Sequence, residues 1–310
     1  MACFQISSFN MERMNYFCEK LPCYLYVKKG GGKKSVGFLN LLIMKIHFMN
    51  VGQGNMVLIQ IPNNKTIIYD CNITKENEYD VLNYLDSKIK SIDIFINSHR
   101  DADHMRGIEK LENRFGISEI WDSGVSGATT DSSEYFNYMN LRRSIGKEVE
   151  ALKYWTFGDC KLRIMNSKNS NFDDANEQSL VVKLEYGGNG VMLAGDTSYR
   201  SWKEFVEKYY SDSDLSSEIL LASHHGSISF FDDPNDEKNY YVSHIKKINP
   251  AMTIISVGDS TLLDDKAVKL YEKYSRGSEQ GNKVFTTLAK GNMLLTLKSE
   301  ESWSLSSNQK

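Results

Sequence analysis

A short apolar run that ends at a cluster of candidate metal ligands constrains this chain more than any other feature. The run, Ile92–Ile96, has the length and composition of a buried strand. Two histidines and two aspartates fall within the six residues that follow Ser98: His99, Asp101, Asp103 and His104. An apolar pattern with helical spacing begins soon after, at Ile108. The order strand, loop, helix predicts that the loop presents these side chains at the edge of a sheet.

The mix of side chains in this loop predicts metal binding. Alternate residues of an extended loop point the same way, so His99, Asp101 and Asp103 can converge. His104 can reach a second position nearby. Imidazole nitrogen and carboxylate oxygen suit zinc, manganese and iron, with bonds of about 2.0–2.2 Å. The alternative is a solvated acidic loop that contains two histidines by chance, a coincidence that composition alone makes rare.

Composition and charge exclude several classes of protein. The chain has 310 residues, 41% of them hydrophobic, and its net charge of -3 provides no global basic field for nucleic acid. Any DNA or RNA binding therefore needs a local basic patch. Five cysteines, an odd number, do not indicate a secreted disulfide framework. With no apolar run of about 18 residues and no apolar N-terminal stretch, the sequence predicts no membrane association and a cytoplasmic location.

The pattern along the chain predicts one domain with two appendages. Residues 1–43 form a leader without periodicity, and they include the basic, glycine-rich run Lys28–Ser35. This run is either a solvated linker or a contact for nucleic acid. We expect a single domain over residues 44–298, rather than two, and a C-terminal tail at 299–310.

Apolar periodicity divides that domain into strands and helices. We expect strands at 45–50, 56–61, 66–70, 92–98, 117–121, 161–165, 179–186, 191–194, 218–222, 251–257, 283–287 and 292–298. We expect helices at 76–88, 105–114, 134–146, 199–209, 239–247 and 265–274. Strands alternate with helices in both halves, and each half begins with antiparallel hairpins. This arrangement predicts an α/β fold in which two sheets pack together under outer helices.

Three further segments carry side chains that could complete a metal site. Asp196 follows a glycine at a strand end, where a lone aspartate usually forms a turn. The pair His224 and His225 precedes a glycine after another strand, and paired histidines in that place are seldom core filling. Asn176, before the strand at 179–186, would by itself be interpreted as a turn residue.

Together these segments resemble the metallo-β-lactamase superfamily. Its His-x-His-x-Asp-His motif corresponds to His99–His104, with aspartate at the second position. The match is closer to one branch, the soluble hydrolase domain of the competence protein ComEC. That branch shares the Val51–Gly54 turn, the Asn176–Val181 strand entry and the His224–Ser227 segment. The resemblance covers residues 44–298 and implies an αββα sandwich of two mixed β-sheets flanked by helices.

The resemblance implies a pair of divalent metal ions, zinc or manganese, and a role for each matching position. His99 and Asp101 would bind the first ion. Asp103 and His104 would bind the second ion, and Asp196 would bridge the two.

The histidine doublet would supply the last ligand. The resemblance favours His225 for this role, but the choice between the two histidines stays open. His224 beside it could bind metal, substrate phosphate or a leaving group. Asp103 and His224 are therefore the candidate catalytic residues.

The sequence departs from the branch in ways that bear on the metal. Asn176 replaces the usual third histidine, and Asn55 stands where the branch commonly has aspartate. No histidine follows His244, although the branch often carries a late one. The ligand set is thus rich in oxygen donors, which suits manganese as well as zinc.

The resemblance implies a metal-dependent hydrolase, a phosphodiesterase or nuclease that acts on DNA. Two cations about 3.5–4 Å apart would activate water and neutralise charge on a phosphoryl oxygen. Two alternatives stay open: hydrolysis of a small molecule (a cyclic nucleotide, phosphoester or lactone), and a subunit with a degenerate metal site in a larger assembly. A protein partner or a homo-oligomer is also left open. Asp70, after the third strand, is either the partner of a ligating histidine or a turn former.

Overall fold

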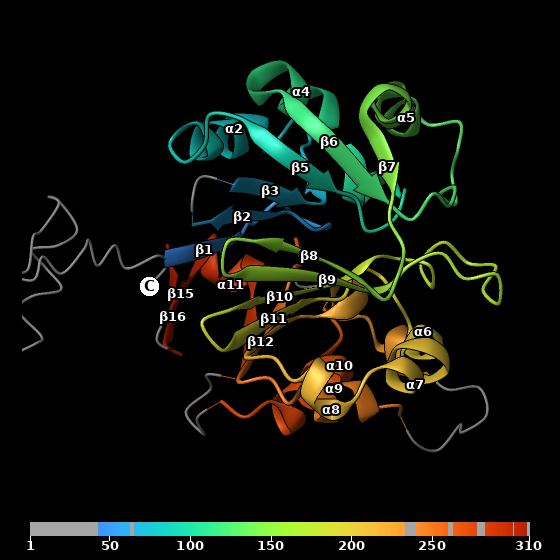
Figure 1. Ribbon diagram of the computed structural model, residues 1–310, viewed down its shortest axis with the longest axis vertical. Helices are drawn as coiled ribbons and strands as arrows, with labels where there is room; N and C mark the ends of the chain where they lie inside the picture. The colour runs from blue at the N-terminus through green and yellow to red at the C-terminus, as the bar shows by residue number, and fades with distance from the viewer. Residues whose placement is uncertain are drawn as a thin grey trace, which may run out of the picture. The chain divides into compact units, whose positions relative to one another are not determined.

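The computed structural model describes residues 43–62, 65–232, 240–259, 263–277, 283–299 and 301–308. The expected leader at 1–43 lies outside these residues, apart from Ile43. In the described part, two mixed β-sheets pack together and helices cover the outer face of each sheet (Figure 1). The predicted α/β fold with two mixed sheets under outer helices is confirmed.

The first sheet has eight strands in the order β16-β15-β1-β2-β3-β5-β6-β7. Their bounds are β1 (Ile43–Phe48), β2 (Val57–Ile61), β3 (Lys65–Tyr69), β5 (Ile92–Ile96), β6 (Ile117–Asp122), β7 (Gly146–Glu148), β15 (Met293–Lys298) and β16 (Trp303–Ser307). Neighbouring strands from β16 to β3 are antiparallel, whereas β3, β5, β6 and β7 are parallel. The parallel part brings the carboxyl ends of β3 and β5 to one edge, where Asp70 and His99 follow.

The second sheet has seven strands in the order β14-β13-β12-β11-β10-β9-β8. Their bounds are β8 (Lys153–Phe157), β9 (Cys160–Asn166), β10 (Val181–Tyr186), β11 (Asn189–Leu193), β12 (Ile219–Leu221), β13 (Met252–Ile255) and β14 (Val284–Thr286). Strands β11 to β14 are parallel. The carboxyl ends of β11 and β12 therefore lie at one edge, where Asp196 and the histidine doublet follow.

Helices α2, α4 and α5 cover the first sheet, and α6 to α10 cover the second (Figure 1). The longer helices are α2 (Glu78–Asp86), α4 (Ile108–Phe115), α5 (Ser133–Ile145), α9 (Ser243–Ile248) and α10 (Asp265–Tyr274). The shorter elements are β4 (Cys71–Asn72), α3 (Ala102–Met105), α6 (Tyr199–Ser201), η2 (Trp202–Val206), α7 (Glu207–Tyr209), α8 (Asp212–Leu215), η3 (Ser223–Gly226), η4 (Ile228–Phe231) and α11 (Thr287–Lys290). Among the described residues, no helix combines the length and the apolar character needed to cross a membrane.

The apolar stripe predicted after the ligand loop faces the first sheet. Ile108, Leu111 and Phe115 of α4 are buried in one cluster with Phe95 and Ile120 of the sheet. Burial of such side chains stabilises the fold by about 1.5–3 kcal/mol each. This packing fixes α4 on the sheet and anchors the chain directly after the ligand loop.

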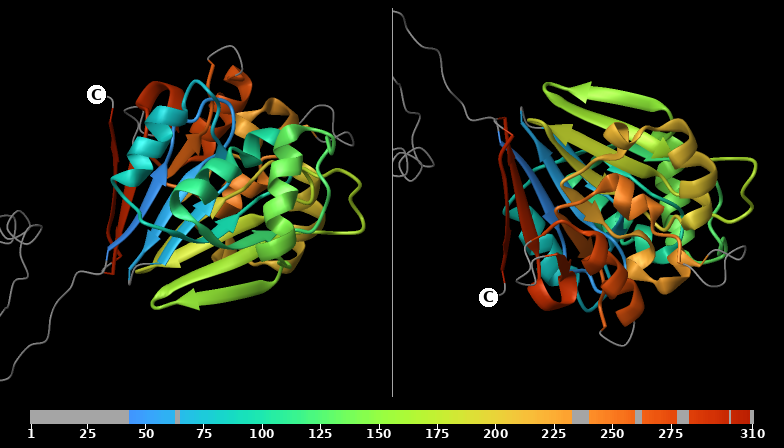
Figure 2. Two further views of the ribbon diagram at one scale, coloured as in Figure 1. Left: turned by 90° about the horizontal axis from the view of Figure 1, so that it is seen from above. Right: turned by 90° about the horizontal axis from the view of Figure 1, so that it is seen from below.

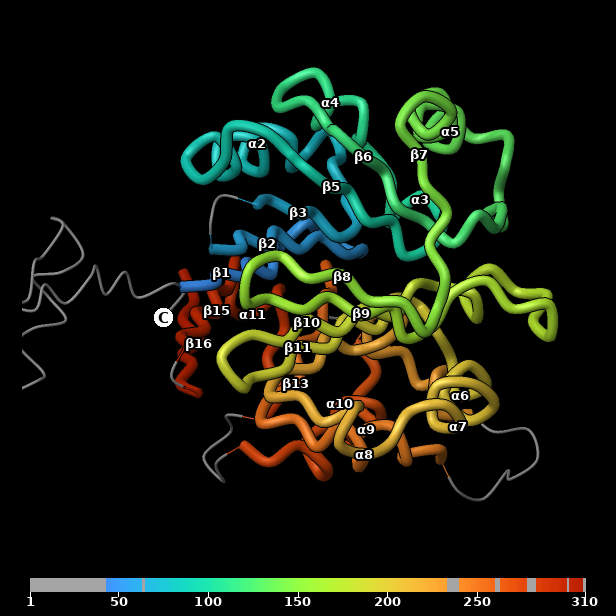
Figure 3. The backbone as a smooth tube through the Cα atoms, viewed as in Figure 1, coloured from blue at the N-terminus to red at the C-terminus, as the bar shows by residue number. Residues whose placement is uncertain are grey.

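The helix expected at 105–114 is interrupted near its start. Residues Ala102–Met105 form the short helix α3, which lies beyond the end of β5 (Figure 3). Gly107 has a φ of 82°, a left-handed conformation that ends the first turn before α4 begins. His104 therefore lies within a helical turn rather than in an extended loop.

Three strands at sheet edges differ from the prediction. The expected tail at 299–310 contains β16, which pairs with β15 so that Leu305 lies opposite Leu295 at the edge of the first sheet (Figure 2). The alternation of half-buried Trp303 and Leu305 with exposed serines accounts for this strand. The tail is therefore part of the sheet at least to Ser307. Strands β7 and β8 were also missed, because an edge strand with a largely exposed face has little apolar contrast.

Candidate metal centre

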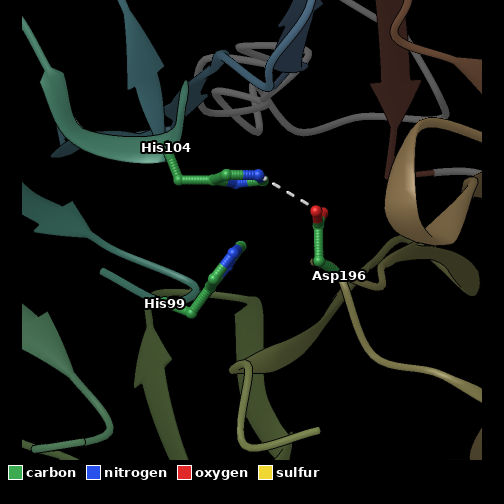
Figure 4. Close-up of side chains that lie close together, drawn as sticks. All are labelled: His99, His104 and Asp196. Carbon is green, nitrogen blue, oxygen red and sulfur yellow. Dashed lines mark ion pairs between the residues drawn. The ribbon is translucent and has the colours of Figure 1, made fainter. Parts of the chain in front are cut away.

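Candidate ligands from both halves of the chain meet at one edge of the two sheets. His99 follows β5, His104 lies in α3, and Asp196 follows β11. Figure 4 shows the side chains of these three residues converging. The carboxyl ends of parallel strands place them there, as in other sheets with helices on their faces.

His104 is held by two carboxylates. Its Nδ1 lies 2.8 Å from Asp70 Oδ2, and its Nε2 lies 3.3 Å from Asp196 Oδ1. Asp70 also accepts hydrogen bonds from the amide and hydroxyl of Ser98, at 2.6 Å and 2.8 Å. An ionised Asp70 accepts only, so His104 donates from Nδ1 and presents Nε2 to Asp196. Asp70 was expected to be either the partner of a ligating histidine or a turn former, and the structure shows its contact with the candidate ligand His104.

The first ligand group consists of His99, His104 and Asp196. One ligand atom from each lies within 4.8 Å of the others, and all three residues are buried. The two imidazole rings have centroids 4.1 Å apart. Within the described residues, His104 Nε2 and Asp196 Oδ1 are buried without a hydrogen-bond partner. Unpaired buried polar atoms are costly, and a cation between them would satisfy both.

The second ligand group consists of Asp103, His104 and His225, again with ligand atoms within 4.8 Å of one another. His225 Nε2 lies 3.3 Å from Asp103 Oδ2 and 3.6 Å from Asp196 Oδ2. The other ring nitrogen, Nδ1, is 3.1 Å from the carbonyl oxygen of Ser256 and donates to it. This leaves Nε2 as an acceptor that faces the carboxylates, the state required of a metal ligand.

The charges at this edge favour a bound cation. Burial alone would lower the pKa of His104, but Asp196 and Asp70 hold that pKa well above its usual value. Burial would raise the pKa of Asp196, yet the charges of His104 and His225 hold it well below the usual range. Burial would also raise the pKa of Asp103, but contacts with His225 and His104 hold that pKa well below its usual range. The carboxylates stay ionised and attract positive charge, which a proton or a metal ion can supply.

The two adjacent histidines occupy different environments. His225 is 5% exposed and belongs to the second group, whereas the His224 side chain is 36% exposed. His224 Nε2 lies 3.9 Å from Asp196 Oδ2. Both residues have a left-handed backbone, with φ of 48° and 53°. Such conformations are strained for residues other than glycine and occur often at functional sites.

The remaining candidates lie outside the two ligand groups. Asp101 Oδ2 is 3.7 Å from His99 Nε2, while Asp101 Oδ1 accepts a hydrogen bond from the Ala128 amide. The half-buried Asn176 has a local contact, in which its backbone N–H donates to Asp174 Oδ1 at 2.8 Å. Asn55 is buried, and its side-chain atoms have no hydrogen-bond partner among the described residues.

Two residues that support the ligands were not found from the sequence. Ser98 bonds to Asp70 and lies 3.0 Å from His99 Nδ1, so it orients the side chains on either side of it. Ser256 acts on His225 through its backbone carbonyl. A main-chain acceptor leaves no signal in a sequence, whereas Ser98 directly precedes the His99–His104 motif.

A comparison with protein families tests the resemblance. The model of the Metallo-beta-lactamase superfamily matches residues 49–228, more than half of the chain. The chain belongs to the metallo-beta-lactamase superfamily. Members typically bind divalent metal ions, and membership supports a hydrolase. The matched part of this superfamily member contains both ligand groups.

Two curated proteins resemble this superfamily member in sequence. Competence protein ComA of Neisseria gonorrhoeae is 23% identical over 180 residues, which are 57% of this chain and 23% of that protein. Recombination protein 2 of Haemophilus influenzae is 23% identical over 218 residues, which are 69% of this chain and 24% of that protein. The chain thus spans about a quarter of the length of these relatives. Both matches support the expected ComEC-like branch.

Solved structures share the superfamily fold at low sequence identity. Igni18, a metallo hydrolase from Ignicoccus hospitalis, has a TM-score of 0.53 and 14% identity, covering 83% of this chain and 99% of that one. YhfI from Bacillus subtilis has a TM-score of 0.51 and 14% identity, covering 83% and 100%. CmlA, a diiron β-hydroxylase from Streptomyces venezuelae, has a TM-score of 0.51 and 13% identity, covering 82% and 54%. The likeness establishes the fold, and fold alone does not fix the reaction.

Proposed function

We propose that this superfamily hydrolase is a metal-dependent phosphodiesterase that cleaves DNA. The observation that carries the proposal is the pair of ligand groups that share His104 at one edge of the sheets. The DNA substrate is supported by the sequence similarity to proteins named for competence and recombination. Two neighbouring divalent cations, zinc or manganese, would suit the cleavage of a phosphodiester.

We assign the ligands to the two ions as the resemblance to the ComEC branch implies. His99 and Asp101 would hold the first ion, and Asp103, His104 and His225 the second. Asp196 would lie between the two ions, because it belongs to the ligand group of His99 and also lies 3.6 Å from His225 Nε2 of the second group. Divalent ions held in this way supply the Lewis acidity that makes water a nucleophile near neutral pH.

The chain's own residues would orient the metal ligands and the substrate. Asp70 holds His104, and the Ser256 carbonyl holds His225, so each imidazole presents one fixed nitrogen. His224 is the candidate for contact with substrate, because it is the more exposed histidine and lies beside Asp196. In this role it would donate a hydrogen bond to a phosphate oxygen or to the leaving group.

The first test removes the charge of one proposed ligand and keeps the size and shape of its side chain. We expect Asp103→Asn to lower metal-stimulated cleavage of labelled single- and double-stranded DNA by at least about a hundredfold, because a ligand charge is lost. His104→Ala should have the same effect. Asp80→Asn, the same change at an exposed position of α2, should leave cleavage unchanged. Full metal-stimulated cleavage by folded Asp103→Asn protein would refute the proposal.

A small phosphodiester or lactone is the second candidate substrate, and the pairing of the nearby arginines favours it. Arg100, within the ligand loop, directs its guanidinium to Asp122 at 2.8 Å instead of toward the ligands. Arg142 is bound to the same carboxylate. Phosphate contacts in DNA-binding proteins normally come from unpaired basic side chains. Turnover of cyclic nucleotides or lactones without cleavage of DNA would identify this second function.

A further inference from the structure

The turn Val51–Gly54, part of the resemblance to the ComEC branch, has no task in the metal roles described above. We propose that Gly54 of this turn is a spacer that sets the separation between Asp103 and His225. By doing so it would determine whether the second ion can bind. The part of the inference that concerns the ion rests on the proposed function, whereas the part that concerns the spacing does not.

On one side the turn lies against the backbone that carries Asp103. A Cβ added to Gly54 would lie 2.5 Å from the Asp103 carbonyl oxygen and 2.8 Å from Asn72 Nδ2. Real Cβ atoms do not approach other atoms this closely, so a side chain at Gly54 must displace its neighbours. Gly54 also has a φ of 130°, which favours glycine. The turn is therefore in direct contact with the segment that supplies Asp103 and His104.

On the other side the turn is bonded to the segment that holds His225. Ser256 Oγ donates a hydrogen bond to the Gly54 carbonyl at 2.7 Å. The backbone carbonyl of Ser256 accepts a hydrogen bond from His225 Nδ1 at 3.1 Å. One residue thus connects Gly54 to His225 through two hydrogen bonds. Movement of the turn must change the position of His225 or break one of these bonds.

Asn72 also connects the turn to the end of α3, through hydrogen bonds to both. Its side-chain amide donates to the carbonyl of Gln53 and, at 3.4 Å, to that of Val51. Its Oδ1 accepts from Arg106 Nη1 at 2.9 Å, and Arg106 directly follows α3. Asn72 is 2% exposed, so its side-chain amide is largely shielded from water. This connection restrains the turn in the position that Gly54 requires.

The result of these contacts is a fixed gap in the second ligand group. Asp103 Oδ2 and His225 Nε2 are 3.3 Å apart and come from opposite sides of the turn. Neither Gly54 nor Asn72 nor Ser256 belongs to a ligand group, so all three are positioning residues. Metal sites need their ligands within a few tenths of an ångström of the preferred distance, and a shifted ligand weakens binding.

The matched pair of variants is Gly54→Ala and Gly52→Ala. Both glycines have a positive φ, 130° for Gly54 and 81° for Gly52, so alanine is strained at each. A Cβ at Gly52 meets nothing within 4 Å, whereas a Cβ at Gly54 meets Asp103. A role limited to turn formation predicts similar effects for the two variants. A spacer role predicts that only Gly54→Ala disturbs the second ligand group.

The experiment titrates manganese into the full-length wild type and both variants, and records electron paramagnetic resonance spectra. We expect two ions and a spin-coupled spectrum for wild type and Gly52→Ala. For Gly54→Ala we expect the spectrum of an isolated ion and about 10–100-fold weaker binding of the second ion. Equal binding of the second ion by Gly54→Ala and Gly52→Ala would overturn the proposal.

Crystal structures of the same three proteins separate the spacer from the metal chemistry. The distance from Asp103 Oδ2 to His225 Nε2 should exceed 3.3 Å in Gly54→Ala and stay near that value in Gly52→Ala. An unchanged distance in Gly54→Ala would refute the spacer role. Wild-type protein that binds no manganese or zinc would instead refute the proposed function, and the distances would still decide the spacer role.

Ser256→Ala provides a second route if Gly54→Ala does not fold. The change removes the hydroxyl that joins Ser256 to the turn and leaves the backbone contact with His225. We expect a folded protein that binds the second ion about tenfold more weakly. Ser217→Ala removes a buried hydroxyl that donates to the Leu215 carbonyl in the second sheet's outer layer and should bind both ions normally. Equal affinity of Ser256→Ala and Ser217→Ala for the second ion would count against the proposal.

Discussion

At the scale of single residues, His104 is the side chain that the two ligand groups share. It is fully buried, and Asp70 lies 2.8 Å from its Nδ1. This contact leaves Nε2 as the only nitrogen that can face Asp196 and Asp103. The identity of the residue at position 70 should therefore decide which nitrogen of His104 carries the proton.

Asp70→Asn tests this dependence. Asparagine keeps the shape and can still accept from Ser98, but its amide can donate to Nδ1 of His104 and shift the proton to Nε2. We expect metal affinity to fall by about 10–100-fold, measured by calorimetric titration, with the circular dichroism spectrum unchanged. Metal affinity equal to that of Asp80→Asn would show that Asp70 has no such role.

Asp122 supports the ligand loop through its contact with Arg100. Its carboxylate accepts from Arg100 Nη2 at 2.8 Å, Tyr138 OH at 2.7 Å and Arg142 Nε at 3.1 Å. Burial would raise the pKa of Asp122, but the hydrogen bond from Arg142 and the charge of Arg100 hold it below the ordinary 3.8. Because the folded pKa is depressed, the stabilisation is fully present above pH 3.8 and is lost as the pH falls through the folded pKa.

Asp122→Asn should therefore destabilise the protein in a pH-dependent way. We expect a loss of about 3 kcal/mol in the free energy of unfolding at pH 7, because two guanidinium groups lose their shared carboxylate. Urea unfolding at pH 7 and at about pH 3 measures the difference between wild type and variant at each pH. The difference should shrink at the lower pH, and an equal difference at both would contradict the assignment.

The sequence pointed to the candidate ligands but not to the residues that orient them. His99, His104, Asp196 and His225 carry side chains whose chemistry and order are visible in one dimension. The role of Ser256 depends on its carbonyl oxygen, which every residue has. Which member of the histidine doublet turns inward also depends on backbone dihedral angles that no side-chain pattern encodes.

At the scale of elements, the separation of α3 from α4 determines where His104 points. Gly107 makes this break with a φ of 82°, and a Cβ there would lie 2.6 Å from Ile73 Cβ. Gly116, at the end of α4, has a φ of 68° but open space around a Cβ. The two glycines therefore share backbone strain and differ in crowding.

Gly107→Ala should be the more damaging of these two substitutions. We expect a loss of about 1 kcal/mol from strain in Gly116→Ala. Gly107→Ala should lose about 2 kcal/mol more, because Ile73 must move. Denaturant unfolding measures both values, and metal titration should show weaker binding only in Gly107→Ala. Equal stability of the two variants would exclude crowding at Ile73 as the constraint.

Elements with a strong apolar contrast were predicted well, whereas three strands at sheet edges, β7, β8 and β16, were missed. The helix now called α10 was expected at 265–274 and is observed at Asp265–Tyr274. Strands β8 and β16 were missed because each pairs on one side only and leaves polar side chains in solvent. For such strands the stabilising contacts come from one neighbouring strand, as Leu305 of β16 pairs with Leu295 of β15, and not from burial of a continuous apolar face.

At the scale of the whole molecule, the topology assembles the candidate centre from both halves of the chain. β5 belongs to the first sheet, and β11 and β12 belong to the second. The residues after these three strands meet because the two sheets pack with the relevant strand ends at one edge. The family resemblance, carried by the order of the motifs, predicted that these residues lie together. The distances between them could be obtained only from the structure of the packed sheets.

The most direct test of the account is a crystal structure of wild-type protein loaded with manganese, with the ions located by anomalous scattering. The account predicts two ions per chain, one bonded to His99 and one to Asp103 and His225, with Asp196 between them and bonds of about 2.0–2.2 Å. Fewer than one ion per chain, or ions bound away from these residues, would contradict it.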